Sequence, residues 1–228
     1  MNIEKQVSFL GKWVFGIVKF SSVLLVSNFI YVFLFLNGYL AETVNEIGTL
    51  ITTGFVLLPF VFAPSFLAVS SCTRLFFRSE ENSPIFRTFW NSYKKNYRLA
   101  MKHGLLYTAI SFVLYAAYWY YGRFGMLGHL IPAILFILVT VLFLFVLSYS
   151  SDRVENILNY WKLSFLLLLN HPLLFLFMVL QVFFIIYFCH FNGAMLLFVA
   201  PGATAMVMMY FYLECCKLEV SKQREYLK

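Results

Sequence analysis

The chain has 228 residues, of which 62% are hydrophobic, 21% aromatic and 12% charged, and its net charge is +7. Soluble domains average about 25% charged residues, so this composition excludes a soluble globule, a disordered region and a coiled coil. Four cysteines are too few for a disulfide scaffold. The remaining class is a polytopic membrane protein, in which lipid surrounds most of the side chains.

Six apolar stretches are long enough to cross a hydrocarbon core of about 30 Å as helices. They are continuous, whereas the strands of a membrane barrel alternate apolar and polar residues. The predicted fold class is therefore all-α: a single membrane domain over residues 1–228 with about six transmembrane helices. In chain order the predicted spans are 13–36, 50–72, 104–121, 130–149, 172–189 and 194–213.

The basic residues predict the orientation of these spans. In the six-span arrangement, 16 of the 17 Lys and Arg residues fall on one side, and only Arg123 falls on the other. By the positive-inside rule, both termini are expected in the cytoplasm. The positive net charge is then explained without a nucleic-acid partner, because basic residues at cytoplasmic borders contact anionic lipid. The first span is too long for the apolar part of a signal peptide, so we expect it to remain in the protein.

The segment 84–102, which precedes the third span, has the pattern of a basic amphipathic helix lying in the membrane interface. Ser83 and Pro84 form a typical helix start. Aromatic residues recur at three- and four-residue steps on one face, and cations occupy the other. We predict either a docking surface for a protein partner or anionic lipid, or a connector that orients the next span. The candidate surface consists of Arg87, Phe89, Trp90, Tyr93, Lys94, Lys95 and Arg98.

A second interfacial helix is predicted over 153–169. Asp152 and Glu155 have the spacing of a capping box at its start, and His171-Pro172 ends it. Shifting the chain by 68 residues aligns the two interfacial regions with six identities in 17 positions. This match predicts a parallel internal repeat, in which spans two and three superpose on spans four and five. The more informative identities pair Asn91 with Asn159, Lys94 with Lys162 and His103 with His171.

Few polar side chains lie at the expected membrane depth. Asn28 and Gln181 are nearest the midplane, where they would either line a polar route or hydrogen-bond a neighbouring helix. His103 and His171 begin two spans and suit helix capping or contact with lipid headgroups. His129 and His190 lie on the outer turns without a third ligand, so we expect no metal site.

The common sequence motifs of catalytic and nucleotide-binding sites are missing from the sequence. It contains no phosphate-binding loop, nucleophile elbow, HExxH pair or glycine-rich dinucleotide loop. It also has no carboxylate within a span that could relay protons. We therefore expect neither an enzyme nor a cofactor.

Several short motifs occur along most of the chain. They are Ala63-Pro64-Ser65, Thr73-Arg74-Leu75, the run 85–90, the run 93–97, Asn170-His171-Pro172 and Ala200-Pro201-Gly202. Through these motifs the chain resembles the YesL-like family of bacterial membrane proteins. The resemblance implies a multi-pass protein of the cytoplasmic membrane, typically from a Gram-positive bacterium and encoded beside carbohydrate ABC importers. It supplies no catalytic residues.

Together, these features predict an accessory component of a carbohydrate ABC uptake system, in contact with its permease or ATPase subunits. The alternative is a stand-alone transporter or channel for a polar solute, with its route lined by Asn28 and Gln181. A membrane enzyme or a lipid-handling protein is a third interpretation.

Overall fold

The computed structural model describes residues 3–78, 84–191 and 193–226, and all regular structure in these ranges is helical. This confirms the predicted all-α class. The elements are α1 (Ile3–Ser27), α2 (Phe29–Leu40), α3 (Val44–Leu57), the π-helical η1 (Leu58–Phe62), α4 (Ala63–Arg78), α5 (Ile85–Tyr121), the 3-10 helix η2 (Gly122–Phe124), α6 (Met126–Ser150), α7 (Ile157–Asn170), α8 (Pro172–His190), α9 (Gly193–Phe198) and α10 (Ala200–Tyr226).

Three to five of the described helical segments are long and apolar enough to span a membrane. Three are uninterrupted: Val44–Arg78, Ile85–Phe124 and Met126–Ser150. Two more arise if each bent helix pair counts as one span. The sequence predicted about six, and the difference includes the segment 194–213. There α9 ends at Phe198 and α10 begins at Ala200, so the apolar stretch is interrupted.

The bends have local causes. The predicted span 13–36 is two helices at 84° because Asn28 leaves the helical conformation, with φ −112° and ψ 30°. Its side-chain amide donates to the carbonyl of Leu24 at 2.9 Å, a bond that competes with regular helix formation. The second bend, of 102°, lies at His171. This residue precedes Pro172, whose ring disfavours helical geometry at the residue before it.

The interfacial segment 84–102 and the span 104–121 were predicted as separate elements, but they form the single helix α5. The predicted cap at Ser83 lies outside the described residues. At the matched position of the other repeat unit, α7 and α8 are sharply bent instead. The 68-residue shift aligns Gly104 of the first unit with Pro172 of the second. The proline disfavours helical geometry at the residue before it, whereas glycine allows the helix to continue. The two units therefore differ in shape at the matched junction, and the predicted superposition does not hold for them as wholes.

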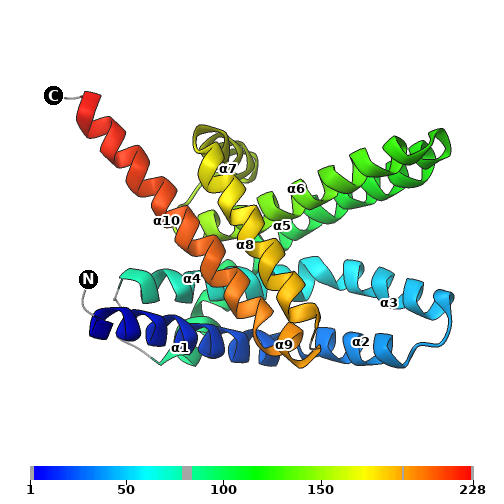
Figure 1. Ribbon diagram of the computed structural model, residues 1–228, viewed down its shortest axis with the longest axis horizontal. Coiled ribbons are helices and arrows are strands. Elements are labelled where there is room, and N and C mark those ends of the chain that lie inside the picture. Colours follow the sequence, from blue (N-terminus) through cyan, green and yellow to red (C-terminus); the bar gives the residue numbers. More distant parts are fainter. Residues whose placement is uncertain (1–2, 79–83, 192, 227–228) are drawn as a thin grey trace.

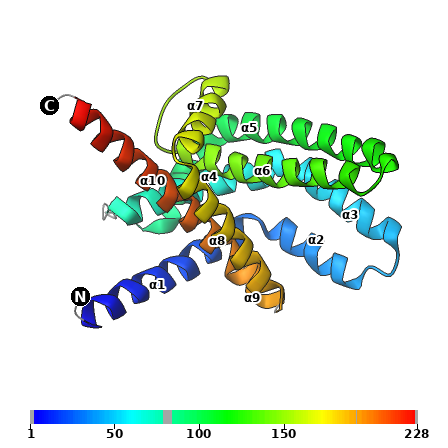
Figure 2. The same ribbon diagram turned by 45° about the horizontal axis from the view of Figure 1, so that its top comes forward.

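Helix α10 forms much of the core, where it contacts α1, α4, α6, α8 and α9. Its buried side chains include Met206, Met208 and Tyr212. Gly202 allows α1 to approach closely, since its backbone N–H donates to the Ser21 hydroxyl at 3.0 Å. Two helix pairs, α2 with α3 and α5 with α6, extend from this core as separate arms in Figure 1, and the turned view in Figure 2 shows the same pairing.

Candidate functional site

Four cations on the first half of α5 are exposed and lie at helical spacing. They are Arg87, Lys94, Lys95 and Arg98, which we call the basic surface. None of the four has an ion pair with an acidic residue in the part of the chain that the structure describes. No acidic residue in the described ranges therefore occupies the basic surface, which can accept an anionic group from outside this chain.

The predicted aromatic partners of these cations are divided between core and surface. Phe89 is 1% exposed and belongs to the core, whereas Trp90 is 45% exposed. Tyr93 is half-buried, and its ring lies 5.4 Å from that of Trp90. Ser92 donates to Ser71 on α4 at 2.8 Å, which fixes the rotation of α5 on its neighbour. Of the aromatic residues predicted for docking, Trp90 and part of Tyr93 are thus accessible.

Asp152 connects three segments of the chain. Its carboxylate accepts hydrogen bonds from Arg74 at 2.6 Å, Arg78 at 3.2 Å and the hydroxyl of Tyr212 at 2.8 Å. Burial alone would raise the pKa of Asp152, but the bonds from Tyr212 and Arg74 and the charges of both arginines together lower it below its usual value. The ends of α4 and α6 are thereby joined to α10.

The predicted capping box is wrong, because Asp152 has these partners and α7 begins only at Ile157. The intervening loop is held by the buried Tyr160 instead. Its hydroxyl donates to the carbonyl of Arg153 at 2.7 Å and accepts from the backbone N–H of Glu155 at 2.9 Å.

The two histidines matched by the repeat are both buried, which differs from the expected headgroup contact, whereas the expected capping applies to His171, the C-cap residue of α7. His103 is fully buried, and its Nδ1 accepts a hydrogen bond from Trp161 Nε1 at 3.2 Å. This bond fastens α7 onto α5. His171 Nε2 lies 2.9 Å from a carboxylate oxygen of Glu219 on α10. His103 thus joins the middle of α5 to α7, and His171 joins the bend between α7 and α8 to α10.

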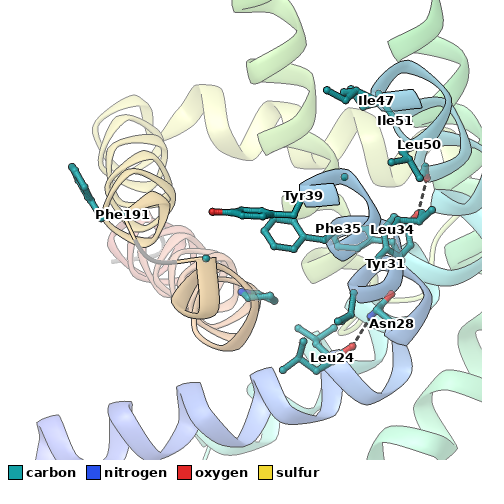
Figure 3. A pocket seen from close by; sticks show the side chains of 17 residues that line it. Leu24, Asn28, Tyr31, Leu34, Phe35, Tyr39, Ile47, Leu50, Ile51 and Phe191 are labelled. Carbon is teal, nitrogen blue, oxygen red and sulfur yellow. Dashed lines mark hydrogen bonds between the residues drawn. The ribbon is translucent and has the colours of Figure 1, made fainter. Parts of the chain in front are cut away.

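The two intramembrane polar residues lie in different places. Asn28 is 8% exposed and belongs to the lining of a pocket of about 820 Å³ between the α1–α2 bend, α3 and the α8–α9 turn (Figure 3). Gln181 is exposed on α8, beside Leu180 and Phe184. The structure does not bring the two amides together. Within the described ranges, no three His, Cys, Asp or Glu residues are close enough to hold a metal ion.

The Asp152 junction was not predicted from the sequence. One signal was present, because Asp152 is the single aspartate of the chain and follows directly on an apolar span. Its partners could not be inferred, since Arg74 and Tyr212 are 78 and 60 residues away along the chain.

Comparison with known proteins gives a family-model match over part of the chain. Residues 24–118 match the family model described as "Protein of unknown function, DUF624", the family that includes the YesL-like proteins. This range extends from the end of α1 through most of α5, including the basic surface. No curated protein and no solved structure matches the chain. The predicted resemblance to YesL-like proteins is thus confirmed over residues 24–118, the part of the chain that matches the DUF624 family model.

Proposed function

We propose that this multi-pass membrane protein lies in the bacterial cytoplasmic membrane with both termini in the cytoplasm. The distribution of Lys and Arg supports this orientation. The basic surface and the Asp152 junction, with Arg74 and Arg78, would then lie at the cytoplasmic side. The α2–α3 and α5–α6 connections lie at the far ends of the two arms in Figure 1 and would face outward.

Its proposed role is that of an accessory component of a carbohydrate ABC uptake system, which works through contact and not through chemistry. The observation that carries this proposal is the exposed basic surface on α5, which has no ion pair among the described residues, with Trp90 beside it. Surface charges of one sign guide association with an oppositely charged partner and determine which partner is accepted. The carbohydrate importer as partner comes from the family resemblance, and anionic lipid at the same face would assist docking.

Charge reversal tests this role. The double variant Lys94→Glu/Lys95→Glu is expected to reduce co-purification of permease or ATPase subunits from native membranes by at least about tenfold, with a parallel loss of sugar uptake. The matched control is Lys12→Glu/Lys162→Glu, which makes the same charge change at exposed lysines on α1 and α7. Both variants are first compared for membrane abundance.

The docking role is rejected if the α5 variant, at normal abundance, retains both the associated subunits and sugar uptake. Equal losses in the two double variants would also reject it, because the effect would then follow net charge and not the basic surface.

The alternative of a stand-alone transporter has less support from the geometry. Asn28 and Gln181 do not share a cavity, so the route that they were expected to line together is not assembled. Uptake of a sugar by liposomes that contain only the purified protein would favour this alternative over the accessory role.

A further inference from the structure

We propose that the pocket at the α1–α2 bend binds one acyl chain of a glycerolipid, with the hydroxyl of Tyr39 donating to the ester carbonyl at its mouth. The pocket volume of about 820 Å³ lies within the range of about 300–1,000 Å³ usual for ligand sites. Its walls are mostly aliphatic and aromatic, and they include Leu34, Phe35, Leu50 and Ile51. This site is separate from the basic surface and goes beyond the accessory role.

The polar side chains of the inner wall are already engaged or enclosed. The amide of Asn28 donates to the carbonyl of Leu24 at 2.9 Å and to Ser27 at 3.2 Å, whereas its Oδ1 has no hydrogen-bond partner among the described residues but is enclosed by surrounding atoms. The hydroxyl of Tyr31 donates to the carbonyl of Gly54 at 2.7 Å. A sugar or an ion in this part of the pocket would leave its own polar groups unpaired, which is costly. A hydrocarbon chain has no such requirement.

The mouth of the pocket, in contrast, carries an exposed polar group. Tyr39 is 82% exposed, and its hydroxyl has no hydrogen-bond partner among the described residues. In Figure 3, Phe35 and Tyr39 extend into the open space that separates α2 from the α8–α9 turn, where Phe191 lies. Helix α2 ends one residue later, and Glu42 follows. Tyrosines are enriched at this kind of boundary between hydrocarbon and headgroups.

The source of the occupant follows from the surroundings of the pocket. The outer side of α2 exposes Phe33, Leu36 and Leu40, so in a membrane this arm is in contact with lipid. The bend at Asn28 directs α2 away from the axis of α1 by 84° and leaves the pocket open beside it. An acyl chain can enter from the bilayer and lie along α2, while its ester group stays near Tyr39. The apolar walls thus suit the acyl tail of the lipid, and the Tyr39 hydroxyl suits its polar ester linkage.

The test is lipid binding by the purified, delipidated full chain, followed by native mass spectrometry. The probes are dipalmitoyl phosphatidylglycerol and its diether analogue, which lacks the ester carbonyls. Ile51→Trp fills the pocket and is expected to weaken binding of the diester lipid by at least about tenfold. Val56→Trp is the matched control, because Val56 is equally exposed on α3 but does not line the pocket. Tyr39→Phe is expected to weaken diester binding about fivefold and to leave diether binding unchanged.

Equal affinities for wild type, Ile51→Trp and Val56→Trp would overturn the pocket assignment and indicate only nonspecific surrounding lipid. Equal binding of diester and diether lipid by the wild type would overturn the role given to Tyr39. Melting temperatures without lipid, measured for each variant, distinguish a filled pocket from a disrupted fold. Docking of the importer through the basic surface is measured independently, so either proposal can fail while the other stands.

Discussion

Asp152→Asn is expected to lower the free energy of unfolding by about 2 kcal/mol, less than the roughly 3–5 kcal/mol typical of a fully buried ion pair because this junction is partly exposed. The substitution keeps the shape of the side chain but removes the charge that pairs with Arg74 and Arg78, whose guanidinium groups would remain close together. The measurement is thermal unfolding in detergent. Glu214→Gln is the control, because it removes a carboxylate whose partner Lys217 is largely exposed, and such pairs contribute about 0–1 kcal/mol.

The same carboxylate predicts a pH dependence. The pKa of Asp152 is lowered in the folded protein, because hydrogen bonds from Tyr212 and Arg74 and the two arginine charges outweigh the effect of burial. Its stabilising contribution is therefore fully present above the unfolded-state pKa of about 3.9 and is lost as the pH falls through the lower folded-state pKa. Below about pH 4, the melting temperature of the wild type should fall more steeply than that of Asp152→Asn. Parallel curves for the two proteins would contradict this assignment.

Gly104→Ala is expected to destabilise the fold by about 1–3 kcal/mol, the usual effect of overpacking. A Cβ atom at this position would lie 2.5 Å from the Cα of Pro59, which is backbone and cannot move aside as a flexible side chain could. The contact is where α5 crosses η1, so the two elements would have to separate. A melting temperature lower by roughly 2–12 °C is the expected result.

The control for Gly104 is Gly48→Ala. Gly48 lies within α3, and a Cβ atom there would meet nothing within 4 Å. Alanine is favoured over glycine in helix interiors by about 1 kcal/mol, so Gly48→Ala should leave stability unchanged or raise it. A decrease of the same size in both variants would show that the crossing at Pro59 is not the cause.

The sequence predicted most helices correctly, but it predicted less well where they end and which of them are continuous. Pro172 correctly indicated where α7 gives way to α8, because proline restricts the residue before it. Asn28 was recognised as a polar residue within a span but not as the position of a bend. Gly104 permits α5 to continue through the boundary that the change from amphipathic to apolar pattern suggested. A change from an amphipathic to an apolar pattern therefore does not by itself mark the end of a helix.

The candidate surface on α5 was predicted in composition but not in orientation. Its four cations are exposed as expected, whereas Phe89 turns into the core. Helical periodicity places residues on faces, but it does not state which aromatic residues of a face a neighbouring helix will cover. Packing of α5 against α4, which includes the hydrogen bond between Ser92 and Ser71, decides that here.

The low content of charge, 12% of 228 residues, was enough to determine a membrane protein. Its continuous apolar runs then determined that the spans are helical, because only helices or closed barrels satisfy their backbone in lipid and barrel strands alternate apolar and polar residues. The tertiary structure alone decided the partners of the few charges and polar groups. Asp152 meets Arg74 and Tyr212 across long stretches of chain, and the pocket at Asn28 is built from segments separated by more than 100 residues. Composition determines the solvent that a chain needs, but contacts between distant segments depend on how the helices pack.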